Sequence, residues 1–125
     1  MEPSDATVEL DLPATPEHVR TARLVSVAVA RRLGLDDPLV EEVRLAVGEA
    51  CARHLSRSPE AARLRLVLRD SRPGGGAGLH VAVLAPGAAP TAQDVDDLAL
   101  AVLRGLVPDL VVEGDRLELH WPAPA

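Results

Sequence analysis

Hydrophobic residues recur along this chain with two different spacings, and together the spacings predict the order of its helices and strands. Between residues 37 and 57, apolar side chains return every three or four positions, as on one face of an amphipathic helix. The same spacing predicts helices over residues 16–33 and 91–106. Alternation of apolar with polar residues, or a short apolar run, predicts strands instead. The predicted strands cover residues 8–12, 63–69, 79–84, 110–112 and 117–121.

The central predicted helix, residues 37–57, has a marked start and a polar border. Asp37 precedes Pro38, which is the pairing of a capping carboxylate with a proline at the first helical position. Glu49 and Arg53 lie beside the apolar face, four residues apart in the acid-before-base order that favours an ion pair. The stripe expected to face the core is Leu39, Val43, Ala46, Val47, Ala50 and His54.

The two flanking helices carry start signals of their own. Thr15 before Pro16 opens the first of them, and Gly34 ends it. Thr91, with Asp94 three residues on, resembles a capping box at the start of the last helix. The expected apolar stripe of that last helix is Val95, Leu98, Val102 and Leu106.

The resulting order is strand, helix, helix, strand, strand, helix, strand, strand. This order predicts an α/β fold, a two-layer α/β sandwich with helices on one face of a mixed or antiparallel sheet. The length of 125 residues is that of one domain with its own hydrophobic core. We expect residues 1–125 to form this single domain, with residues 1–6 and 122–125 as flexible tails.

Composition excludes several classes of function. The chain has one aromatic residue of the Phe, Tyr and Trp group, Trp121, which we assign to the core or to an edge cap rather than to a ligand platform, and the net charge of the chain is −6. A nucleic-acid binder needs a basic face to neutralise phosphate, so none is expected as partner. Without an apolar run of membrane-spanning length or a basic secretion signal, and with a single cysteine, Cys51, the protein is expected in the cytoplasm and off membranes. Four scattered histidines predict no metal site.

Residues 45–57, LAVGEACARHLSR, resemble the N-box of the RsbW-type anti-sigma factors. These are small serine kinases of the GHKL superfamily, which have the histidine-kinase/Hsp90-like (Bergerat-like) ATPase fold. The motif reads approximately A-V-S-E-A-V-T-N-A-x-x-H, and Glu49 and Ala50 match it. Arg53 stands where the family has its Mg²⁺-binding asparagine. A guanidinium has donors and no acceptor, so Arg53 cannot ligate the metal.

The other nucleotide motifs of this family are degenerate here. An Asp-x-Gly-x-Gly box should follow strand 79–84, but Ala85 holds the aspartate position that would select adenine and only Gly87 remains. The second glycine box falls near Asp97 and Ala99, in a helix start whose acidic residues would repel a triphosphate. The resemblance implies ATP and Mg²⁺ as cofactors, and the lost ligands predict that neither binds. Glu49 is then a vestige of the catalytic motif.

A second motif concerns protein partners. Residues 21–25, TARLV, resemble the family's Ala-Arg-x-x-Val, whose arginine docks the sigma factor and the STAS-type antagonist. The resemblance makes Arg23, with Arg20 one turn earlier, a candidate for contact with a partner. It also implies a homodimer, or a heterodimer with a related kinase. The alternative for Arg23 is an ordinary solvated side chain on a helix surface.

Three hypotheses for function follow. The leading one is an anti-sigma-factor-like pseudo-ATPase that works by protein docking to a sigma factor, a STAS-domain protein or a family kinase. The second is an active ATP-dependent serine kinase with unorthodox boxes, in which Arg53 or Arg57 neutralises phosphate. The third is a small α/β domain whose Glu49–Arg53 pair is a surface ion pair worth a few tenths of a kcal/mol.

Overall fold

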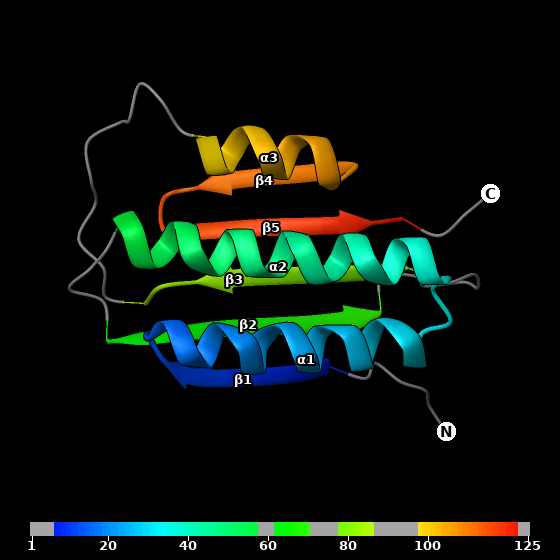
Figure 1. Ribbon diagram of the computed structural model, residues 1–125, viewed down its shortest axis with the longest axis horizontal. Helices are drawn as coiled ribbons and strands as arrows, with labels where there is room; N and C mark the ends of the chain where they lie inside the picture. Colours follow the sequence, from blue (N-terminus) through cyan, green and yellow to red (C-terminus); the bar gives the residue numbers. More distant parts are fainter. Residues whose placement is uncertain (1–6, 58–61, 71–77, 87–97, 123–125) are drawn as a thin grey trace.

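The protein is a two-layer α/β sandwich, as its sequence predicts (Figure 1). The computed structural model describes residues 7–57, 62–70, 78–86 and 98–122. In these residues five strands form one antiparallel sheet, and three helices lie side by side over one of its faces. In chain order the elements are β1 (Thr7–Pro13), α1 (Pro16–Arg32), α2 (Asp37–Arg57), β2 (Arg63–Asp70), β3 (Leu79–Leu84), α3 (Leu98–Leu106), β4 (Asp109–Glu113) and β5 (Arg116–Trp121).

The strand order is β1-β2-β3-β5-β4, and every neighbouring pair is antiparallel. The central place of β3 agrees with its apolar run, because a strand with neighbours on both sides and helices above it needs few polar residues. β2 lies between β1 and β3, so its exposed arginines lie on an interior strand and not on an edge strand of the sheet. The edge strands among the described residues are β1 and β4.

The helix starts differ in detail from the prediction. The N–H of Leu39 donates to Oδ1 of Asp36 at 3.2 Å, so the capping carboxylate of α2 is Asp36 and the prediction of Asp37 was wrong by one residue. An N-cap side chain reaches the amide three positions on, and Asp37 is already inside the helix. Thr15 precedes α1 as predicted but makes no side-chain cap; its Oγ1 lies 2.7 Å from Nδ1 of His18.

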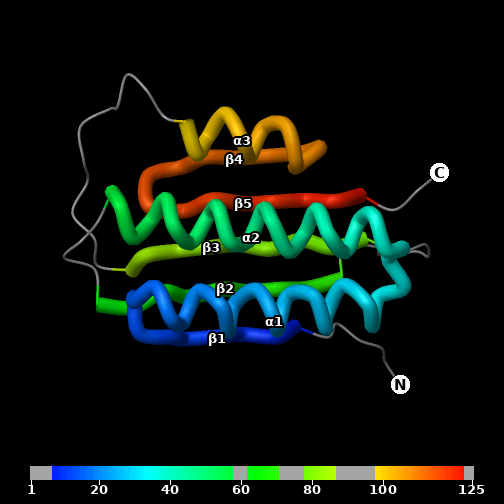
Figure 2. The backbone as a smooth tube through the Cα atoms, in the orientation of Figure 1, coloured from blue at the N-terminus to red at the C-terminus, as the bar shows by residue number. Residues whose placement is uncertain are grey.

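The core lies between the sheet and α2, which runs antiparallel to α1 across the middle of the sandwich (Figure 2). Val43, Ala46, Val47 and Ala50 of the predicted stripe are fully buried. They pack on the alternate leucines and valines of β2, β3 and β5. Trp121 is 1% exposed, which confirms its assignment to the core.

The predicted apolar stripe of α3 was right at Leu106, which packs partly buried against the core, and wrong at Leu98 and Val102, which are 77% and 41% exposed. Leu103, outside the predicted stripe, is fully buried. The helix is apolar around most of its circumference, so spacing alone did not decide which side rests on its neighbours α2 and β4. The capping-box residues Thr91 and Asp94, with Val95, lie outside the described residues.

Residues 1–6 and 123–125, which include most of both predicted tails, also lie outside the described part of the chain. Within that part, no helix combines the length and the apolar character needed to cross a bilayer.

Candidate functional site

The second half of α2, the end of β3 and the turn between β4 and β5 meet at one end of the sandwich, on the left in Figure 1. Two hydrogen bonds tie these segments together. Nε2 of His54 on α2 lies 2.9 Å from the carbonyl oxygen of Val83 on β3. The N–H of Ala85 donates to the carbonyl oxygen of Asp115 in the turn at 3.3 Å. The structure therefore brings the predicted N-box helix to the position predicted for the adenine-selecting residue.

His54 is a buried structural histidine, as the sequence suggested. Because a carbonyl oxygen only accepts hydrogen bonds, Nε2 carries the ring proton and donates a hydrogen bond to the carbonyl oxygen of Val83. Burial lowers the pKa of His54, and the positive charges of Arg53 and Arg57 act in the same direction. The hydrogen bond to Val83 and the charge of Asp115 oppose this lowering of the pKa. The ring is thus held neutral in its place between α2 and β3.

Glu49 and Arg53 share the site but do not pair. Among the ion pairs of the described residues, none joins these two side chains, so the predicted i,i+4 pair was wrong. Arg53 is only 8% exposed and takes part in another interaction, whereas Glu49 stays partly exposed. The spacing permits the pair, but Arg53 is buried and takes part in an interaction other than with Glu49.

The positions of the two glycine boxes are only partly described. Ala85 follows β3 directly and is fully buried, and Ala99 lies partly buried in the first turn of α3. Gly87 and Asp97 lie outside the described residues. The structure thus places Ala85 beside the end of α2 and leaves the glycine boxes as predictions.

The two candidate partner residues lie on α1, which packs beside α2. Arg20 is exposed and Arg23 is half-buried. Arg23 crosses Gly48 of α2: a Cβ atom added to Gly48 would meet Cδ of Arg23 at 2.9 Å and Nη1 at 3.4 Å. The stem of Arg23 therefore packs against α2, while the side chain as a whole is only partly buried.

Gly48 is a residue that sequence reasoning missed. A glycine in a helix interior costs about 1 kcal/mol relative to alanine, so its presence between Val47 and Glu49 was the available signal of a close approach. The guanidinium of Arg23 also reaches the neighbourhood of Cys51. Burial raises the pKa of the Cys51 thiol to about 12, and the charge of Arg23 works against that rise.

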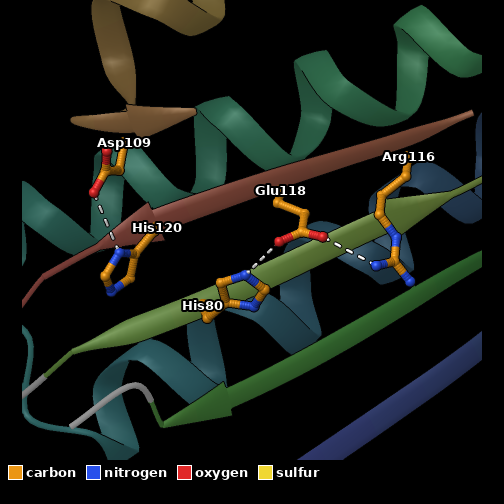
Figure 3. A network of polar contacts seen from close by, with 5 residues as sticks. All are labelled: His80, Asp109, Arg116, Glu118 and His120. Carbon is orange, nitrogen blue, oxygen red and sulfur yellow. Dashed lines mark hydrogen bonds and ion pairs between the residues drawn. The ribbon is translucent and has the colours of Figure 1, made fainter. Parts of the chain in front are cut away.

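A second polar cluster, also missed, stands on the open face of the sheet (Figure 3). Nε2 of His80 lies 3.1 Å from Oε1 of Glu118, and Nη1 of Arg116 donates to Oε2 of the same carboxylate at 3.0 Å. Nδ1 of His120 lies 3.5 Å from Oδ2 of Asp109. Partial burial disfavours ionisation of Glu118, but the hydrogen bonds from His80 and Arg116 prevail and lower its pKa. Alternation in β3 and β5 was the signal, since it places these residues on one face.

In the part of the chain that the structure describes, no three or more His, Cys, Asp or Glu side chains are grouped so that they could hold a metal ion. The polar cluster on the sheet thus consists of ion pairs and hydrogen bonds.

The architecture and the position of α2 define a class of protein. An antiparallel five-stranded sheet covered on one face by helices, with a glutamate on the helix that ends beside the central strand, is that of a GHKL-type ATPase domain. The family model of the histidine kinase-like ATPase domain matches residues 12–121, and the chain belongs to this family. No curated protein matches the chain.

Proposed function

We propose that the protein is an anti-sigma-factor-like regulator that acts by docking to another protein, and that it has lost ATP binding and kinase activity. The observation that carries the proposal is Ala85. Its methyl group is fully buried at the end of β3, where a nucleotide-binding member would present a carboxylate to adenine. A methyl group offers the adenine amino group no acceptor.

Arg53 adds a second argument. It occupies the position of the metal-binding asparagine, is 8% exposed, and carries only donors. Mg²⁺ needs oxygen ligands in octahedral geometry. A guanidinium at this position removes one ligand and adds a positive charge that repels the metal. A nucleotide that depends on Mg²⁺ to bridge its phosphates loses its usual anchor.

The docking surface of the proposal is centred on Arg23 and Arg20. The stem of Arg23 packs against Gly48, which restricts the side chain before any partner arrives. A confined side chain loses less conformational entropy on binding than a free one, which favours its use in an interface. The partners proposed are a sigma factor, a STAS-domain protein or a related kinase, which would place the protein in the cytoplasm. Assembly as a homodimer, or as a heterodimer with such a kinase, is part of the same proposal.

The nucleotide part of the proposal is tested by calorimetric titration of the purified protein with ATP, with and without Mg²⁺. We expect no binding heat up to about millimolar ATP, where the free energy of binding would be only about −4 kcal/mol. Metal-dependent binding in the micromolar range, about −8 kcal/mol, would contradict the proposal.

The docking part is tested by capture of a purified sigma factor or STAS-domain protein from the same genome. Arg23→Glu should reduce capture strongly, because it reverses the charge of a confined side chain. Arg31→Glu is the matched control, since Arg31 is an exposed arginine in the last turn of the same helix. Equal capture by both variants and the wild type would remove Arg23 from the interface.

A second candidate is an active serine kinase of this family, and the family match over residues 12–121 is the observation that favours it. In this candidate Glu49 acts as general base and Arg53 or Arg57 neutralises phosphate. Glu49→Ala would then abolish phosphate transfer to a partner. Transfer that persists in this variant would count against a catalytic Glu49, and absence of transfer by the wild type would support the docking proposal.

A further inference from the structure

The edge of the sheet formed by β4 exposes apolar side chains on both of its faces. Val111 is 47% exposed on the open face of the sheet, and Val112 is 36% exposed on the helix side. The helix above β4 adds Leu98 and Val102 (Figure 1). Four of the six exposed large hydrophobic residues of the described chain thus lie on β4 and α3.

The backbone at this edge is also open. β4 pairs with β5 on one side, and no described strand pairs with its other side. Along an antiparallel strand, successive residues direct their N–H and C=O groups to opposite sides of the strand. At an edge strand, every second residue therefore offers unpaired N–H and C=O groups to an added strand. A second extended segment could therefore continue the sheet beyond β4.

Charge decides which kind of segment fits. On the open face β4 presents Asp109, Val111 and Glu113, which is an acidic, apolar and acidic row. If two copies paired through β4 in antiparallel orientation about Val111, Asp109 of each copy would face Glu113 of the other. Like charges directly opposite one another are destabilising. This charge pattern therefore disfavours pairing of β4 with a second copy of itself and favours pairing with a strand that carries basic residues.

The same complementarity already exists at the other side of the sheet. There β1 presents Glu9 and Asp11, and the register sets Val67 opposite Glu9 and Arg65 opposite Asp11. Nε of Arg63 lies 3.0 Å from Oδ1 of Asp11, in a diagonal ion pair. Within this fold, the acidic strand β1 therefore pairs with β2, a strand in which arginines alternate with apolar residues.

We propose that the edge of β4 with which no described strand pairs docks an extended segment of a partner protein that carries two basic residues four positions apart, with apolar residues between them. The segment would add a strand to the sheet, set its basic side chains opposite Asp109 and Glu113, and cover Val111, Val112 and the exposed side of α3. This edge lies across the molecule from α1, so the inference does not rest on docking at Arg20 and Arg23 (Figure 1).

The test uses the full chain and a fluorescein-labelled, end-capped peptide, Thr-Arg-Leu-Val-Leu-Arg-Thr, in a fluorescence anisotropy titration. We expect saturable binding. The peptide with both arginines replaced by glutamate should have a dissociation constant at least about tenfold higher, because its charges repel Asp109 and Glu113. A peptide with N-methylated alternate amides should not bind, because it cannot pair with a strand edge. Equal binding of either control peptide, or no binding of the basic one, would overturn the proposal.

On the protein side, Val111→Arg should weaken binding of the basic peptide roughly tenfold. Val111 is solvent-exposed and opposite Glu118, so the new arginine is expected to leave the fold intact. Leu45→Arg is the matched control, with 44% exposure and the same change of charge on α2. Unchanged affinity in Val111→Arg would refute the site. If that variant fails to fold, the comparison of the three peptides on the wild type decides.

Discussion

Substitution of Gly48 by alanine tests whether Arg23 is held between α1 and α2. An alanine in a helix interior is worth about 1 kcal/mol more than a glycine. The added Cβ would lie 2.9 Å from Cδ of Arg23, which is a contact that real Cβ atoms essentially never show. Cδ lies in the middle of the stem, so the side chain must leave its rotamer or the helices must separate. Overpacking of this kind costs about 1–3 kcal/mol.

The net effect of Gly48→Ala in the wild type should thus be a loss of stability of up to about 2 kcal/mol. In an Arg23→Ala background the obstacle is absent, and the same substitution should stabilise the protein by about 1 kcal/mol. The coupling energy between the two positions is the difference between these effects, on the order of 1–3 kcal/mol.

Urea denaturation of the four proteins of this cycle measures the coupling, provided that the m-values agree. Gly105→Ala is the control, because Gly105 lies in α3 with no atom within 4 Å of an added Cβ. Its effect should be the same in both backgrounds. If Gly48→Ala raises the free energy of unfolding equally with and without Arg23, Arg23 is not confined by α2 and the reasoning fails.

Four further predictions concern single residues. The pKa of His54 is lowered in the folded state, so the unfolded state binds more protons, and stability should fall as the pH drops below about 6.5. His54→Gln keeps a donor for Val83 without titrating, so its unfolding free energy should depend less on pH between 7 and about 5; parallel curves for both proteins would contradict this. With the thiol pKa of Cys51 raised to about 12, iodoacetamide at pH 8 should label the native protein about a thousandfold more slowly than in urea, by mass spectrometry. Equal rates would show that the thiol is accessible. Leu66→Ala should cost about 2–5 kcal/mol in urea denaturation, because the side chain is fully buried in the core. Leu98→Ala should change stability by less than about 0.5 kcal/mol, and a larger loss would mean that Leu98 is covered.

Much of the fold was predictable because each element has a buried and a solvated side. The bounds of α2 and β3 agree with the predicted ranges, and the burial of Val43 and Val47 follows from their spacing. The apolar run of β3 also agrees with its interior place in the sheet. The face of α3 was not predictable, since leucine and valine occur around most of that helix and only its neighbours select the buried side.

The candidate site divides in the same way. The sequence by itself determined the residue types at the predicted positions: an arginine where the resemblance predicts a metal-binding asparagine, and an alanine where it predicts an adenine-binding aspartate. The tertiary structure alone decided the surroundings of side chains, such as the burial of Arg53 and the packing of the Arg23 stem against Gly48. The physical reason is that spacing fixes which neighbours within an element a side chain can reach. Which residues it contacts across elements depends on how the helices and strands pack.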